Sequence, residues 1–130
     1  MQPLAIKSAV TAAAAVLLLA PSASAAVPMS ANDTNEEVTI SVKGRGLHVD
    51  TITVTSRKQR THEAFRVYRH TGSSASQSNV TRWKRARFHN AGMTRFAAAS
   101  WKVNRTFPHG TWLCAMAKQS SGSPCIRVHR

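Results

Sequence analysis

Residues 37–43 alternate polar and apolar side chains with a period of two, which is the pattern of a β-strand with one face in a core. Val38, Ile40 and Val42 take the apolar phase of this strand. No window after residue 26 keeps a helical period of 3.6 residues, and clusters rich in Ser, Gly, Pro and Asn separate most of the later segments. The further segments with strand character are 47–54, 64–69, 81–88, 97–103, 112–118 and 125–129.

This spacing of short strands predicts an all-β fold, a small antiparallel β-sandwich that is broadly immunoglobulin-like. A small closed β-barrel is the alternative. Within 47–54 the apolar phase changes, because Leu47 and Val49 lie on one phase and Ile52 and Val54 on the other. We therefore expect a bulge or a bend near Asp50 and Thr51. Residues 93–101 keep a helix as an alternative, since they contain three consecutive alanines, although Gly92 and the β-favouring end of the segment weaken it.

The N-terminus has the layout of a secretory signal peptide. Lys7 precedes an apolar run from Ala9 to Ala20, and Pro21 and a series of small residues follow it. We predict a signal peptide over residues 1–26, cleaved near Ala25 or Ala26, and therefore a secreted, extracellular protein with no transmembrane segment in the mature chain. The polar residues 27–36 are expected to form a flexible leader, and residues 37–130 a single β domain.

Cys114 and Cys125 are the only cysteines. In an exported chain such a pair is best interpreted as one structural disulfide, and the lack of a C-x-x-C motif argues against redox use. We expect no metal and no cofactor. If the last two strands pair through the cysteines, Trp112 shares a face with Arg127 and His129, and these three residues form a possible second binding surface.

The segment SWKVNRTFPHGTWLC, residues 100–114, with its second Cys in a short returning strand, resembles the tail of small secreted actinobacterial proteins without an assigned function. The Ala-rich export signal is similar as well. The resemblance covers about 30 residues and implies secretion and a stapled terminal hairpin, with no catalytic residues.

The chain carries 18 Lys and Arg against 5 Asp and Glu, a net charge of +13, and the charge is unevenly placed. Every acidic residue lies at or before Glu63, so the second half has an uncompensated field that attracts polyanions. The densest run is 82–89, and we expect it to bind polyanions, since Arg guanidinium groups suit phosphate oxygens. An edge strand that uses charge to prevent aggregation is an equally weighted alternative. The candidate polyanion-binding residues are Arg82, Trp83, Lys84, Arg85 and Arg87.

We expect a secreted, cationic, non-catalytic binding protein that engages polyanions at the cell envelope, either wall phosphate polymers or nucleic acid. An antimicrobial or bacteriocin-like toxin, a secreted protein-binding or inhibitor module and a small secreted ribonuclease are the alternatives. For the ribonuclease, the close imidazole–carboxylate pairs are His62 with Glu63 and His48 with Asp50. Adjacent strand residues point to opposite faces, and two ligands are too few for a metal site, so no catalytic residue is assigned.

Overall fold

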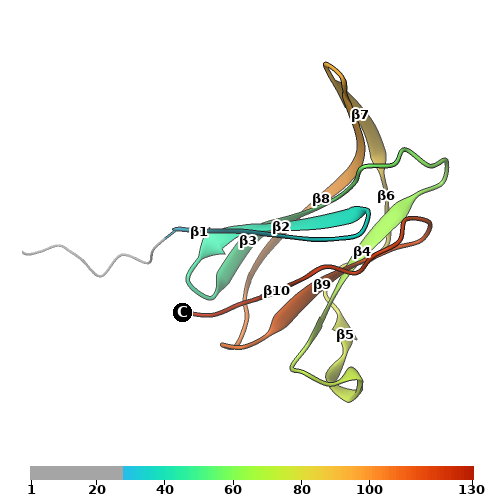
Figure 1. Ribbon diagram of the computed structural model, residues 1–130. Helices are drawn as coiled ribbons and strands as arrows, with labels where there is room; N and C mark the ends of the chain where they lie inside the picture. Colours follow the sequence, from blue (N-terminus) through green and yellow to red (C-terminus); the bar gives the residue numbers. More distant parts are fainter. Residues whose placement is uncertain (1–27) are drawn as a thin grey trace, which may run out of the picture.

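Two antiparallel sheets make up the protein in the computed structural model, which describes residues 28–130 (Figure 1). Sheet 1 has the strand order β1-β2-β3-β8-β7 and sheet 2 the order β10-β9-β4-β5, with β6 paired to the other end of β4. The strands of sheet 1 are β1 (Pro28–Asn35), β2 (Val38–Arg45), β3 (His48–Ser56), β7 (Arg87–Ala91) and β8 (Thr94–Thr106). Those of sheet 2 are β4 (Ala64–His70), β5 (Ser78–Asn79), β6 (Lys84–Arg85), β9 (Trp112–Ala117) and β10 (Cys125–Arg127), and a short 3-10 helix, η4 (Ser74–Ser76), precedes β5.

The predicted fold class is confirmed, and residues 28–130 contain no closed barrel. The orders β2-β3-β8-β7 and β4-β9-β10 are those of the two sheets of an immunoglobulin-like sandwich. The predicted disulfide between Cys114 and Cys125 is also confirmed, and the two cysteines are directly paired across β9 and β10. It therefore joins neighbouring strands of one sheet, whereas the immunoglobulin disulfide connects the two sheets.

The core lies between the sheets and follows the alternation of the sequence. Val38, Ile40 and Val42 are fully buried, as the period of β2 predicts. The largest buried side chains are Phe65 on β4 and Phe107 after β8. The other members of the core cluster are Val49, Ile52, Val54, Val67, Ala99, Leu113, Ala115, Ile126 and Val128.

The expected bulge in β3 is present at Asp50. Lys43 and Gly44 of β2 pair with Thr51 and Val49, so Asp50 is the extra residue. The bulge restores the inward phase, and both Val49 and Ile52 are buried. The helical alternative for residues 93–101 is wrong, because residues 94–101 lie in β8, which pairs with both β3 and β7.

The flexible leader expected over 27–36 is wrong for the residues that the structure describes, because β1 pairs along its whole length with β2. Its polar side chains find partners across the sandwich. Asp33 accepts a hydrogen bond from the Cys125 backbone N–H at 3.0 Å, and Asn35 accepts one from that of Ser123 at 3.1 Å. Composition alone misses such a strand, since an edge strand with one exposed face needs few apolar residues.

The single strand expected over 81–88 is also wrong. The chain pairs with β4 in sheet 2 as β6, crosses over at Ala86 and continues in sheet 1 as β7. Ala86 is partly buried against the core, and its N–H donates to the Glu63 carbonyl at 2.9 Å. The run at 82–89 is therefore divided between the two sheets.

The predicted signal peptide and Val27 lie outside the described residues. Within the part of the chain that is described, the structure contains no helix that could span a membrane.

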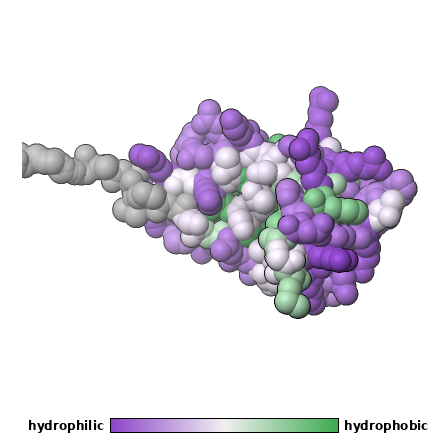
Figure 2. All heavy atoms as spheres, turned by 90° about the horizontal axis from the view of Figure 1, so that it is seen from above, coloured by the Kyte–Doolittle hydropathy of each residue, from purple (hydrophilic) through white to green (hydrophobic). Residues whose placement is uncertain are grey.

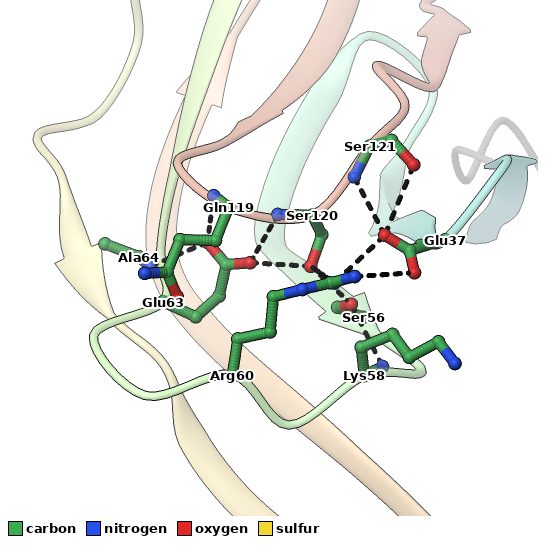
Figure 3. Close-up of polar contacts among 9 residues, drawn as sticks. All are labelled: Glu37, Ser56, Lys58, Arg60, Glu63, Ala64, Gln119, Ser120 and Ser121. Atoms are coloured by element: carbon green, nitrogen blue, oxygen red, sulfur yellow. Dashed lines mark hydrogen bonds and ion pairs between the residues drawn. The ribbon is translucent and has the colours of Figure 1, made fainter.

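A buried polar network ties the loops at one end of the sandwich together (Figure 3). At its centre is Glu63, whose side chain is 1% exposed. Its Oε1 accepts hydrogen bonds from the N–H groups of Ala64 and Gln119, both at 3.0 Å. Its Oε2 accepts from the N–H and the hydroxyl of Ser120 at 2.7 and 2.6 Å. Four donors thus surround one buried carboxylate, and their hydrogen bonds offset the free-energy cost of burying it.

The network continues to Glu37 through Arg60. The two guanidinium Nη atoms of Arg60 donate to the two carboxylate oxygens of Glu37 at 3.0 and 3.1 Å, and the Ser121 N–H donates to the same carboxylate at 3.0 Å. The hydrogen bonds from Arg60 and Ser121 hold the pKa of Glu37 at about 2, below its ordinary value of 4.5. The β1–β2 turn, the β3–β4 loop and the β9–β10 loop are therefore fixed to one another.

Candidate functional site

Hydrophilic side chains gather toward one end of the molecule. In the view of Figure 2 the strongly hydrophilic residues are densest toward the side where β6 and β7 lie in Figure 1, and residues of intermediate hydropathy cover the part nearer β1 to β3. This agrees with the sequence, in which the second half holds nine Arg, three Lys and no acidic residue.

Four of the five acidic side chains are engaged elsewhere, and the fifth, Glu36, is exposed in the β1–β2 turn, outside the groove. Glu63 and Glu37 belong to the buried network, Asp33 binds the β10 backbone, and the Asp50 carboxylate lies 3.4 Å from the His48 Nε2. Among residues 28–130, Arg60 is the only Arg or Lys that forms an ion pair with a carboxylate. The cations of the second half are therefore left for an external anion.

A groove of about 510 Å³ opens between segment 80–84 and β8. It exists because β7 pairs with β8 only as far as Ala98, so that the later part of β8 has β3 on one side and no strand on the other within the described chain. Cations and indoles line the groove from both sides: Arg82, Trp83 and Lys84 from the one segment, and Trp101, Lys102 and Arg105 from β8.

Trp83 is held in place by two cations. The guanidinium carbon of Arg66, on β4, lies 4.6 Å from the centroid of its ring, and Nζ of Lys118, just after β9, lies 5.0 Å from it. The indole remains 36% exposed. Trp83 is thus fixed at the rim of the groove, with part of its surface free.

Lys84 spans the groove. Its Nζ donates a hydrogen bond to the Ser100 carbonyl at 2.5 Å and lies 5.9 Å from the centroid of Trp101. This contact caps an unpaired carbonyl on the open side of β8, which is a common protection of strand edges. Trp101 itself is partly buried and packs against the core cluster.

The five residues predicted to bind polyanions do not form a single surface. Arg82, Trp83 and Lys84 line the groove, whereas Arg85 and Arg87 line a neighbouring pocket that Lys84 also borders. One Arg85 Nη lies 2.7 Å from Nδ1 of His62. All five are exposed.

Sequence reasoning missed half of the groove. Trp101, Lys102 and Arg105 place the same mixture of cation and indole on β8, but about twenty residues after the run at 82–87. Their adjacency depends on the crossing of the chain from sheet 2 to sheet 1, which no local pattern shows. Arg66 and Lys118 were missed for the same reason, because they reach Trp83 from β4 and from the residue that follows β9.

The structure pairs two of the three residues of the possible second binding surface. Trp112 and Arg127 are direct cross-strand partners on β9 and β10, as the cysteine register predicts. His129 lies beyond the end of β10, where its Nδ1 is 3.1 Å from the Arg130 carbonyl. His70 stacks on Trp112 with ring centroids 6.2 Å apart, and Tyr68 stacks on His70 at 6.4 Å.

The two imidazole–carboxylate pairs have different geometries. Glu63 is buried in the polar network while His62, with φ 69°, points outward to Arg85, so the two side chains diverge. His48 does lie near Asp50, but its ring nitrogens are already within 2.9 Å of Thr106 Oγ1 and 2.8 Å of Asn104 Oδ1.

His70 also lies close to the sulfur atoms of Cys114 and Cys125, with all three potential ligand atoms within 4.8 Å of one another. Both sulfurs belong to the disulfide and are not thiolates, so the cluster lacks the ligands that a metal needs.

Comparison of the chain with protein-family models, with curated proteins and with solved structures finds no match.

Proposed function

We propose that this is a secreted cationic binding protein that holds a phosphodiester polymer of the cell envelope, a wall polymer or a nucleic acid, in the groove between segment 80–84 and β8. The observation that carries the proposal is the absence of any acidic partner, among residues 28–130, for the groove cations. A chain of phosphates supplies negative charges at regular intervals, and Arg and Lys bind them by charge-assisted hydrogen bonds.

The expected strength of binding depends on salt. If four groove cations each displace one counterion from a single-stranded polymer, the logarithm of the affinity falls against log salt with a slope of about −2.8. Between about 50 and 200 mM salt, the affinity then drops about 50-fold. We would measure it by fluorescence titration with an oligodeoxythymidylate and with poly(glycerol phosphate). Retention that is unchanged in about 1 M salt contradicts the proposal.

The groove is tested against the general charge of the protein by two variants that lose the same number and kind of cations. The groove variant replaces Arg82, Lys84, Lys102 and Arg105 by Ser, and the control variant replaces Lys43, Arg45, Arg57 and Lys58 by Ser. All eight side chains are exposed, so both variants should fold, which circular dichroism checks. We expect the groove variant to lose most of the affinity and most of the dependence of the affinity on salt. Equal losses in the two variants contradict the assignment of the groove.

The same preparations distinguish the other classes of function. Dye release from anionic vesicles favours a toxin, a salt-resistant 1:1 complex with a secreted protein favours an inhibitor module, and shortening of RNA favours a ribonuclease. Each of these results, obtained without salt-sensitive polymer binding, contradicts the proposal.

A further inference from the structure

Resting on the proposed function, we infer that the polymer in the groove is a single-stranded nucleic acid whose bases stack on Trp83 and Trp101. Cations alone hold any polyanion, but the groove also presents two indoles, one from each wall. A wall polymer of glycerol or ribitol phosphate has no ring that gains from an indole. A nucleic acid base has a π-face that stacks on an aromatic side chain whatever the base sequence.

Trp83 has the fixed position that a stacking platform needs. Arg66, on β4, and Lys118, just after β9, lie over its ring, and the flanking residues Arg82 and Lys84 are exposed cations. A phosphate that follows a stacked base along the strand therefore meets a cation next to the ring. An exposed indole of this size is also costly to keep in water, and Trp83 is the only exposed Trp of the described residues.

Trp101 provides the second ring on the opposite wall. Its inner side packs against the core, and it lies on β8 beyond the last residue that pairs with β7. Lys102 and Arg105 of the same strand also line the groove and supply cations on this wall. Anchoring in the core lowers the conformational entropy that stacking would otherwise cost.

The arrangement favours a single strand over a duplex. Bases in a duplex are stacked on one another and present only their edges in the grooves, so neither indole can reach a π-face. In a single strand the bases are free to leave their own stack. Loss of one stacked base typically lowers affinity about 5- to 150-fold.

The experiment compares four probes of equal charge: an oligodeoxythymidylate, the same backbone with abasic sites, a duplex, and poly(glycerol phosphate). We expect the oligodeoxythymidylate to bind at least about 5-fold more tightly than the abasic strand and to quench tryptophan fluorescence. Trp83→Ala and Trp101→Ala should each remove most of this difference and leave the affinity for the abasic strand unchanged. Trp101→Phe should restore part of it, because a phenyl ring still stacks.

The matched control is Phe96→Ala, which removes a half-buried aromatic ring from the part of β8 that pairs with β7, outside the groove, and should change neither affinity. Since Trp101 packs on the core, Trp83→Ala at the exposed rim tests the inference even if Trp101→Ala does not fold. Equal binding of the oligodeoxythymidylate and the abasic strand overturns the inference and leaves the proposed function intact. So does tighter binding of poly(glycerol phosphate). Failure of all four probes to bind overturns both.

Discussion

Replacing Glu63 by Gln should destabilise the fold strongly, because the amide keeps only one of the two oxygens that the network uses. If the new NH₂ group faces Ala64 and Gln119, two backbone N–H groups lose their acceptor. If it faces Ser120, only one backbone N–H is stranded, since the hydroxyl rotates to accept from the amide. The second orientation is therefore cheaper and should be adopted.

The size of the effect follows from this count. One stranded N–H costs about 1 to 3 kcal/mol, and the remaining hydrogen bonds lose their charge assistance, so we expect a total loss of about 2 to 4 kcal/mol in the free energy of unfolding. With a urea m-value of about 2 kcal/mol/M, the midpoint of urea unfolding should fall by about 1 to 2 M.

Urea unfolding followed by circular dichroism measures this shift, with Glu36→Gln as the control, since Glu36 is exposed and should change stability by less than about 0.5 kcal/mol. Ser120→Ala removes one donor to Glu63 together with the partner of the Ser56 hydroxyl and of one Arg60 Nη; it should cost about 1 to 3 kcal/mol and provides a second test if Glu63→Gln does not fold. A loss below about 0.5 kcal/mol for Glu63→Gln at an unchanged m-value would refute the role assigned to the network.

Three further predictions concern the disulfide, the pH dependence of stability and the contact between the β9–β10 loop and β1. Replacing both Cys114 and Cys125 by Ala should lower stability by about 2.8 kcal/mol in the chain-entropy model for a separation of 11 residues, and an unchanged melting temperature would contradict this. The pKa of Glu37 is depressed in the folded state, so its contribution is complete above about pH 4.5 and is lost as the pH falls toward about 2; the advantage in melting temperature over Glu37→Gln should shrink across that window, and a constant difference would be inconsistent with it. Gly122→Ala should reduce stability, because its φ is +112° and an added Cβ collides with the Asn35 carbonyl, and a urea midpoint equal to that of the wild type would show that the loop yields freely.

The sequence predicts those parts of the fold that local alternation controls. The buried phase of β2 and the bulge at Asp50 follow from the spacing of Val and Ile, and the disulfide follows from the presence of only two cysteines, whereas the sequence leaves the register of β9 with β10 open. Each of the predicted features needs only residues close to one another in the chain, or a covalent bond.

The parts that could not be predicted depend on long-range partners. β1 is polar and gains its stability from β2 and from N–H groups about ninety residues away. The break at Ala86 arises because Glu63 supplies a hydrogen-bond acceptor and the core a place for the methyl group. The groove depends on this acceptor and on this packing site, because it opens only where the chain leaves sheet 2 and does not yet pair with β8 in sheet 1. Half of the candidate site was therefore visible in the run at 82–87 and half was not.

The contacts of β1 with the last turn of the chain also constrain when the protein can fold. Asp33 binds Cys125 across 92 residues and Asn35 binds Ser123 across 88, so the first strand is completed by nearly the last segment. Contacts of this separation form slowly, because a large loop must close before they contribute. A chain that is synthesised from its N-terminus therefore cannot complete its native contacts until about residue 125 has left the ribosome.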